Sequence, residues 1–424
     1  MENNLDYLKR KLALKQVRVK LRYDYYEQKK HRQEERIMPP WLKGMYESTV
    51  GWCGKAVDEL SDRLVFLGFD ENTDIYGTMD IFASNNPDVF FDSAIQEALI
   101  GSCAFAHVSH GDNGELMPKL SVLTALDATG IIDEQTYMLK EGYAILDRDK
   151  DRRPTVEAYF IPGRTEYHFL NTGEIVVEES ECRYPLLVPI VYKPTAKRPF
   201  GHSRISRSCM YLQQLAENTL RRAEVSGEFY SFPQKYVVGT DPDLDPMDAW
   251  KASISAMLRF DKDADGDKPQ VGQFSQQSMQ PYTDQLRTAA SMFAGETGLT
   301  LDDLGFVSDN PSSADAIKAA HDSLRVIARK AQRNFASAFA NVGYVGACVR
   351  DNQPYSRSMV TDMKAKWMPI FEPDASMIST VGDAAIKVNQ AVPGFFNFEN
   401  LTELTGLESG EPVGVEETDD GTGE

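Results

Sequence analysis

Hydrophobic and polar positions follow two different periods along the chain. Apolar residues recur every three or four positions, as in amphipathic helices, in five segments: residues 4–36, about 42–64, about 203–228, 281–298 and the stretch after Ser312. Between residues 120 and 179 short apolar runs alternate with polar residues instead, and Asn171-Thr172-Gly173 separates two of them as a hairpin turn does. The two periods predict an α+β fold for residues 1–202.

The segment 203–228 carries a single apolar stripe. Its members recur at helical spacing and are Ile205, Cys209, Leu212, Ala216, Leu220 and Ala223. The opposite side mixes both charge signs, and Glu217 precedes Arg221 by four residues, the favoured order for an ion pair within a helix. This helix is expected to bury one side only.

The helix predicted after Ser312 is long and two-sided. Ser312 is a suitable N-cap residue, and Pro311 before it cannot lie inside a helix. One arc of the helix is apolar, from Ile317 to Phe339, and the opposite arc is cationic. The basic residues of that arc are Lys318, Arg325, Arg329, Lys330 and Arg333.

Residues 231–280 interrupt the helical pattern with a strand, a short helix, an acidic loop and a second strand. The loop contains Asp261, Asp263 and Asp265 followed by Gly266, which resembles the front half of a calcium-binding loop. The rear half requires a carboxylate at the twelfth position, where this chain has Gly272. A solvated acidic turn is therefore predicted, with no metal.

Other candidate chemistry is sparse. His107, His110 and Asp112 suggest loop histidines after a strand end, because no companion ligands accompany them. The chain has no phosphate-binding loop of the form GxxxxGK[ST] and no GxSxG or HExxH. Its five cysteines are scattered and unpaired in sequence, which indicates reduced thiols. No enzyme activity and no cofactor are predicted, although a metal-dependent nuclease built from dispersed carboxylates stays open as an alternative.

Charge is distributed unevenly in a chain of net charge −19. Residues 1–36 carry eleven Lys or Arg against six acids, which favours a solvated helix face, with nucleic-acid binding as the alternative. Residues 408–424 carry seven acids and no base, a composition typical of segments that do not order themselves. The sequence shows neither a long apolar run nor a leader pattern, so we expect an intracellular protein without a membrane span.

The order of these segments resembles bacteriophage portal proteins, the head–tail connectors of long-tailed double-stranded DNA phages. The resemblance spans about residues 23–395. It is carried by four stretches: YDYYEQKKHR (23–32), AVDELSDRLVFLGFD (56–70), KRPFGHSRI (197–205) and FAGETGLTLDDLGFVSDNPSSADAIKAAHDSL (293–324).

The resemblance implies a portal fold that assembles as a ring, usually of twelve copies. Residues 1–202 and 314–395 would form the two parts of the wing, the latter with the long helix. The remaining segments would be the first stem helix (203–230), the clip (231–280), the second stem helix (281–298), the tunnel loop (299–313) and a short crown or disordered acidic tail (396–424).

The resemblance also implies roles for individual residues. The DNA-facing tunnel loop would present Phe306, Val307, Ser308, Asp309, Asn310, Pro311 and Ser312. Subunit contacts would involve Arg325, Arg329 and Arg333, with Arg221 and Glu217. The clip would dock the packaging motor and later the adaptor through Asp241, Asp243, Asp245, Trp250, Asp261, Asp263 and Asp265.

The implied function is structural. The ring would sit at one vertex of the capsid in the virion, after assembly in the host cytoplasm, and would pass double-stranded DNA during packaging and ejection. Its partners would be further copies of itself, DNA, the terminase large subunit, the major capsid and scaffolding proteins and a head–tail adaptor. Another capsid or tail-adaptor protein is the remaining alternative.

Overall fold

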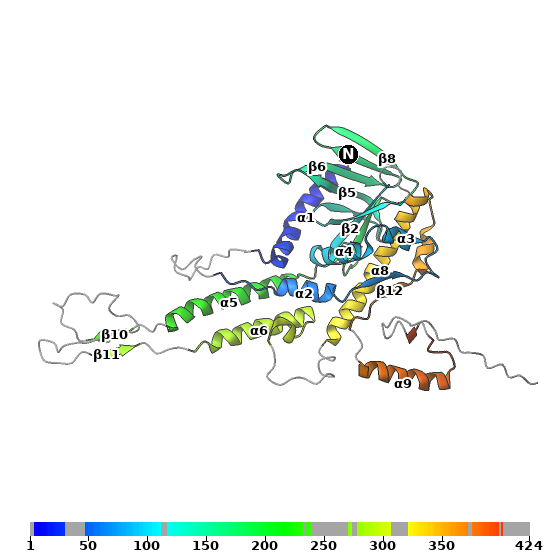
Figure 1. Cartoon of the computed structure of the whole chain (residues 1–424). Helices are drawn as coiled ribbons and strands as arrows, with labels where there is room; N and C mark the ends of the chain where they lie inside the picture. The colour runs from blue at the N-terminus through cyan, green and yellow to red at the C-terminus, as the bar shows by residue number, and fades with distance from the viewer. Residues whose placement is uncertain are drawn as a thin grey trace, which may run out of the picture. The chain divides into compact units, whose positions relative to one another are not determined.

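A computed structural model describes residues 4–29, 47–111, 117–231, 235–238, 270–273, 278–306, 321–371, 375–397 and 400–401. The chain forms two compact units (Figure 1). The first unit contains residues 1–26, 55–205 and 321–424, and the second contains residues 27–54 and 206–320.

A five-stranded antiparallel meander forms one sheet of the first unit. Its strands follow one another in chain order: β4 (Ala128–Ile132), β5 (Leu139–Arg148), β6 (Pro154–Ile161), β7 (Arg164–Phe169) and β8 (Glu174–Glu179). The predicted hairpin joins β7 to β8. Gly173 adopts φ +73° at the turn and donates its N–H to the carbonyl of Phe169 at 2.8 Å, a conformation that glycine reaches without strain.

A three-stranded sheet has β2 (Cys103–Ser109) at its centre, between β3 (Lys119–Thr124) and β9 (Leu187–Val191). Helix α4 (Pro87–Gly101) leads directly into β2 through Ser102, whose φ is +84°. Because α4 packs on β2 and α8 packs on β2 and β9, the central strand is buried along most of its length. The chain thus passes from helix to strand at Ser102.

A further strand pair joins distant parts of the first unit. Strand β1 (Phe66–Phe69) pairs with β12 (Ala365–Trp367), almost 300 residues later in the sequence. Gly68 lies inside β1 with φ +124°, although a glycine just after an apolar helical segment commonly ends a helix. A long-range partner therefore decides the conformation of this stretch.

Further helices among the described residues are α1 (Asn4–Tyr26), α2 (Trp52–Ser61), α3 (Thr78–Ala83), α8 (Asp322–Asp351) and α9 (Ala375–Ala391), with the short 3-10 helix η3 (Arg357–Asp362). Helix α8 packs against α3, β2 and β9. At its centre Phe339 is fully buried, and its ring lies 4.8 Å from that of Phe91 and 5.1 Å from that of Phe66 (centroid to centroid). The aromatic core of the first unit is formed here.

The second unit is built on two helices, α5 (Arg207–Ser231) and α6 (Gln280–Thr297), which pack side by side (Figure 1). Between them in sequence, β10 (Lys235–Val238) pairs antiparallel with β11 (Gln270–Gln273). The 3-10 helix η2 (Asp302–Leu304) follows α6. The strands expected at both ends of the insert are thus present, and the short helix expected between them lies outside the described residues.

Two predicted helices are shorter than their periodicity suggested. The helix expected over 4–36 ends at Tyr26 as α1, and Gln28 adopts φ +56°, which a continuing helix does not allow. The helix expected from about Leu42 begins at Trp52, because residues 47–51 are not helical. The α+β fold class itself is confirmed.

Candidate functional site

Helices α5 and α6 run antiparallel, and polar contacts tie them together at both ends. Near the start of α5 the hydroxyl of Ser206 donates to Glu296 at 2.9 Å, and near its end Ser226 and Tyr282 share a hydrogen bond of 2.7 Å. The β10–β11 hairpin continues from the second of these ends. The arrangement is a helical pair with a two-stranded extension.

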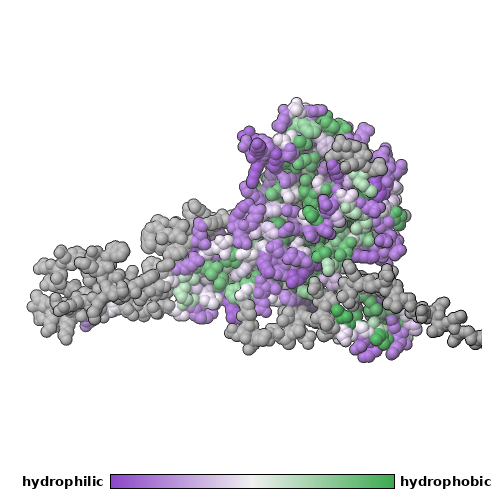
Figure 2. Space-filling model, viewed as in Figure 1, coloured by the Kyte–Doolittle hydropathy of each residue, from purple (hydrophilic) through white to green (hydrophobic). Residues whose placement is uncertain are grey.

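Burial along this pair is uneven. Cys209, Leu212 and Ala216 of the predicted stripe are buried, whereas Leu220 and Ala223, nearer the hairpin, are only half-buried. Helix α6 repeats the gradient: Ala289, Ala290, Phe293 and Thr297 are buried, and Leu286 is half-buried. Figure 2 shows hydrophobic residues on the visible surface of this unit among hydrophilic ones. The half nearer the hairpin therefore keeps apolar surface in contact with solvent.

Large apolar side chains also point away from the pair. Tyr211 of α5 and Met292 of α6 are 65% and 59% exposed. Glu217 and Arg221, expected at a subunit contact, are half-buried on α5, and Glu217 accepts a hydrogen bond of 3.2 Å from Gln213. The side-chain oxygen of the buried Gln213 also accepts a hydrogen bond of 2.8 Å from the backbone N–H of Cys53. This part of α5 therefore makes its polar contacts within the second unit.

The expected tunnel loop begins in the described part of the chain. Phe306 is half-buried, its N–H donates to the carbonyl of Leu301 at 3.0 Å, and its ring lies edge-on to that of Trp52 at 6.5 Å. Packing therefore anchors this residue at the base of the loop. The other expected members, Val307, Ser308, Asp309, Asn310, Pro311 and Ser312, lie outside the described residues.

The expected docking residues of the clip also lie outside the described residues: Asp241, Asp243, Asp245, Trp250, Asp261, Asp263 and Asp265. The structure does describe the strands on either side of them. Val238 and Gln270, the described residues on either side of the segment 239–269, pair with each other.

The cationic arc predicted on the long helix is exposed on α8. Arg325, Arg329 and Arg333 face solvent, and Arg325 forms an ion pair with Asp322 one turn earlier. The apolar arc of the same turns is buried at Leu324, Ala328, Ala331 and Phe335. The two-sided helix is confirmed from Asp322 onward, whereas from Ala338 to Val349 every residue is buried.

His107 is a buried strand residue, which corrects its interpretation as a loop histidine. It lies in β2 against the ring of Phe160, with 5.2 Å between ring centroids, and burial lowers its pKa to about 4. His110 lies near Glu178 of β8, at 2.7 Å from Nδ1 to the carboxylate. Within the described ranges no group of three or more His, Cys, Asp or Glu residues is arranged to hold a metal ion.

The sequence did not indicate two apolar surfaces that the structure leaves exposed, one on β8 and one on α1. The edge strand β8 exposes Ile175, Val176 and Val177. Helix α1 exposes Leu14 and Val17 while burying Leu8 and Leu12. Apolar periodicity identifies helices and strands, but it does not say which apolar residues find a partner within the same chain.

Comparison with known proteins supports the resemblance drawn from the sequence. The chain is similar to the portal protein of Mycobacterium phage D29, with 29% identity over 174 residues, which covers 39% of this chain and 35% of the relative. The portal protein of Mycobacterium phage L5 is 29% identical over 147 residues, covering 32% and 29%. The chain thus matches about a third of the length of these curated relatives. No family model matches it.

Solved structures with a similar chain come from gene transfer agent (GTA) particles. A chain from the neck of the empty particle, computed with C6 symmetry, has a TM-score of 0.48 and 13% identity, covering 85% of this chain and 90% of that one. A chain from the virion of the native particle has a TM-score of 0.45, with the same identity and coverage. Among the helices that the structure describes, none is long and apolar enough to cross a membrane.

Proposed function

We propose that this protein is the subunit of a portal ring, a non-enzymatic channel through which double-stranded DNA enters and leaves a capsid at one vertex. The observation that carries the proposal is the sequence similarity to two mycobacteriophage portal proteins. The ring is expected in the virion, after assembly in the host cytoplasm.

The α5–α6 pair supports ring assembly in physical terms. A subunit of a closed ring contacts its two neighbours through two different patches, and both must exist on the free subunit. Tyr211 on α5 and Met292 on α6 are large, exposed and apolar, features that mark interaction surfaces. We assign these helices to the stem, with residues 203–230 and 281–298 as its bounds.

The arginines of α8 provide a second contact type. Arg325, Arg329 and Arg333 follow one another every four residues on the exposed side of a helix whose other side is buried. Because the chain carries a net charge of −19, an acidic surface of a neighbouring subunit is a suitable partner for them. We infer that this face serves assembly, together with Glu217 and Arg221.

DNA contact is assigned to the tunnel loop. Residues 307–312 carry no base and one acid, and strong binding to phosphates depends on Lys and Arg. A loop of this composition touches DNA without holding it, as a channel requires. The clip residues between β10 and β11 are proposed to dock the terminase large subunit during packaging and the head–tail adaptor afterwards, while scaffolding and capsid proteins surround the wing.

Electron microscopy of the purified full-length chain tests the ring. Closed rings with a central opening of DNA width are expected. A protein that stays monomeric at every concentration, alone and with capsid and scaffolding proteins present, contradicts the proposal.

The tunnel loop is tested in rings that assemble. Deletion of residues 307–311 is expected to leave rings intact and to impair genome packaging, whereas full packaging by this variant removes the assigned role. Incubation of the same protein with DNA and magnesium or manganese tests the alternative enzyme: cleavage that is lost on replacing one carboxylate indicates a nuclease.

A further inference from the structure

Helix α1 presents a face on which apolar and basic residues lie side by side. Its apolar members are Tyr7, Leu14, Val17 and Leu21, and Leu14 and Val17 are 78% and 74% exposed. Its basic members, Lys11, Lys15, Arg18 and Arg22, recur at spacings of four, three and four residues and therefore form one stripe along the helix. These eight residues are called the apolar–basic face below.

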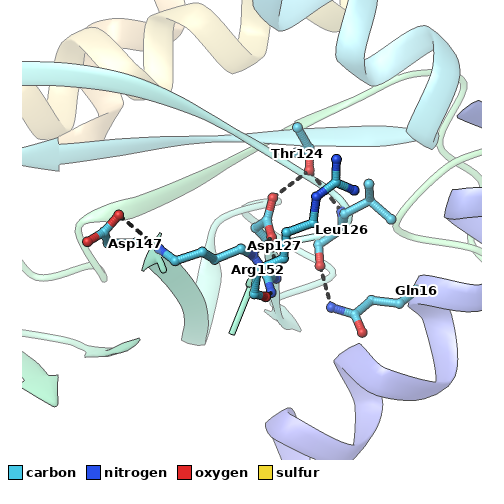
Figure 3. A network of polar contacts seen from close by, with 7 residues as sticks. Gln16, Thr124, Leu126, Asp127, Asp147 and Arg152 are labelled. Atoms are coloured by element: carbon cyan, nitrogen blue, oxygen red, sulfur yellow. Dashed lines mark hydrogen bonds and ion pairs between the residues drawn. The ribbon is translucent and has the colours of Figure 1, made fainter. Parts of the chain in front are cut away.

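The opposite side of α1 fixes the helix to the five-stranded sheet. Leu8 and Leu12 pack on Tyr143 and Ile145 of β5. Figure 3 shows Gln16 donating to the carbonyl of Leu126, at 2.7 Å, in the turn before β4, where Asp127 is held by further polar contacts. The apolar–basic face is thus presented by a rigidly placed helix, and its exposed leucine and valine are not a consequence of fraying.

The cations of this face have donors to spare. Lys11 donates to the carbonyl of Gly130 at 2.6 Å, and Arg22 donates to that of Gly101, the last residue of α4, at 2.7 Å. An ammonium has three donors and a guanidinium five, so each keeps several for another partner. Within the described ranges no carboxylate forms an ion pair with Lys11, Lys15 or Arg22.

The surroundings do not neutralise these charges. Lys15 lies over the ring of Phe200, 4.2 Å from its centroid, and Lys11 lies 5.0 Å from the same centroid. Partial burial, followed by the neighbouring charge of Lys15, lowers the pKa of Lys11 to about 8. The thiol of Cys103 lies near these cations, but burial raises its pKa to about 11, so it is neutral at pH 7. A carboxylate at this face relieves the repulsion between the cations.

The C-terminal segment of the chain has a chemistry that is complementary to the face. Residues 398–424 carry nine acids and no base, and they include Phe398, Leu404 and Leu407. The 23 residues after Leu401 have a contour length of up to about 80 Å, which exceeds the diameter of a domain of this size. Because the segment belongs to the same chain, its effective concentration at the face is far above that of a free ligand.

We propose that the apolar–basic face of α1 binds residues 398–424 of this protein, with carboxylates against the basic stripe and apolar side chains against Tyr7, Leu14, Val17 and Leu21. The segment comes from the same chain or from a neighbouring copy. The proposal does not depend on ring assembly. It explains why a helix rich in exposed apolar residues carries unneutralised cations in an otherwise acidic protein.

Zero-length carbodiimide cross-linking of the full-length protein, read by mass spectrometry, tests this contact. Amide links are expected between the amines of Lys11 or Lys15 and carboxylates in residues 399–424. Arg18→Glu is expected to reduce their yield at least about tenfold, since the reversal places like charges together and tenfold corresponds to about 1.4 kcal/mol. Lys20→Glu is the matched control: it makes the same charge change roughly 160° around the helix and leaves the yield unchanged.

A second measurement distinguishes the segment from nucleic acid as the occupant. Fluorescent double-stranded DNA is titrated into the wild type and into a full-length variant with the nine acids of 398–424 replaced by amides. A rise in DNA affinity of at least tenfold in the variant, reversed by adding Arg18→Glu, is expected if the segment covers the face. Absence of the cross-links overturns the proposal. So does equal DNA affinity of the wild type and the amide variant, if Arg18→Glu weakens DNA binding in both.

Discussion

The two units differ in how completely their helices bury their apolar side chains. In the first unit α8 is buried on every side from Ala338 to Val349, and an aromatic cluster surrounds Phe339. In the second unit α5 and α6 are buried along one half, while Leu220 and Leu286 stay half-exposed and Tyr211 faces solvent. The first unit therefore closes its core around α8, whereas the helices of the second unit leave apolar side chains exposed.

The largest expected effect comes from removing the centre of the first core. Phe339→Ala deletes a fully buried ring that contacts Phe66 and Phe91, and the resulting cavity is expected to cost about 3–5 kcal/mol of unfolding free energy. Val326→Ala, at an exposed position on the same helix, should change it by less than about 0.5 kcal/mol. Thermal and urea unfolding measure both variants, and equal midpoints would show that α8 is not the centre of the core.

His107 makes the stability of the first unit depend on pH. Its pKa is about 4 in the folded protein against 6.5 for a free histidine, so below pH 6.5 the unfolded chain binds a proton that the folded chain does not. The contribution of His107 to the free energy of unfolding is therefore fully present above pH 6.5 and is lost as the pH falls toward 4. Where the unfolded chain binds one full proton more than the folded chain, the loss is about 1.4 kcal/mol per pH unit. In His107→Leu the loss between pH 7 and pH 5, measured by urea unfolding, should be smaller. An identical loss in both proteins contradicts the assignment.

Gln213 tests the buried half of the second unit. Replacement by Ala leaves the backbone N–H of Cys53 without its acceptor in a buried site, which is expected to cost about 1–3 kcal/mol locally. Hydrogen exchange in peptides covering residues 47–60 should speed up accordingly. Gln280→Ala removes a hydrogen bond of similar length at an exposed position of α6 and should leave exchange unchanged. Equal exchange rates in the two variants would mean that the site of Gln213 is no better protected from solvent than the exposed site of Gln280.

The smallest effect on stability is expected from the arginines of α8. Arg325, Arg329 and Arg333 are exposed, so changing all three to Ala should alter unfolding by less than about 1 kcal/mol. Ring formation should nevertheless be impaired, because we assign this face to subunit contacts. Native mass spectrometry compares the triple variant with the wild type, and a Lys330→Ala variant serves as a control for loss of an exposed charge. Normal rings from the triple variant would show that the face is only solvated.

Local sequence was sufficient for several parts of the fold. The apolar stripe of α5, the two-sided start of α8 and the hairpin at Asn171-Thr172-Gly173 all appear in the structure, because each depends on residues close together in sequence. The similarity to portal proteins also followed from the order of short stretches. The role of the tunnel loop stays a prediction that the deletion of residues 307–311 tests, and the roles of the clip and the stem stay predictions.

The sequence did not determine which faces of the helices and strands are buried by other segments of the chain. The pairing of β1 with β12 joins residues almost 300 positions apart, and it places Gly68 in a strand instead of at a helix end. Likewise, the basic residues of α1 read as a solvated face, whereas the structure sets Lys11 and Lys15 against Phe200 and exposes Leu14. The physical reason is the same in both cases: periodicity records the conformation of neighbouring residues, while burial depends on distant segments that only the folded chain brings together.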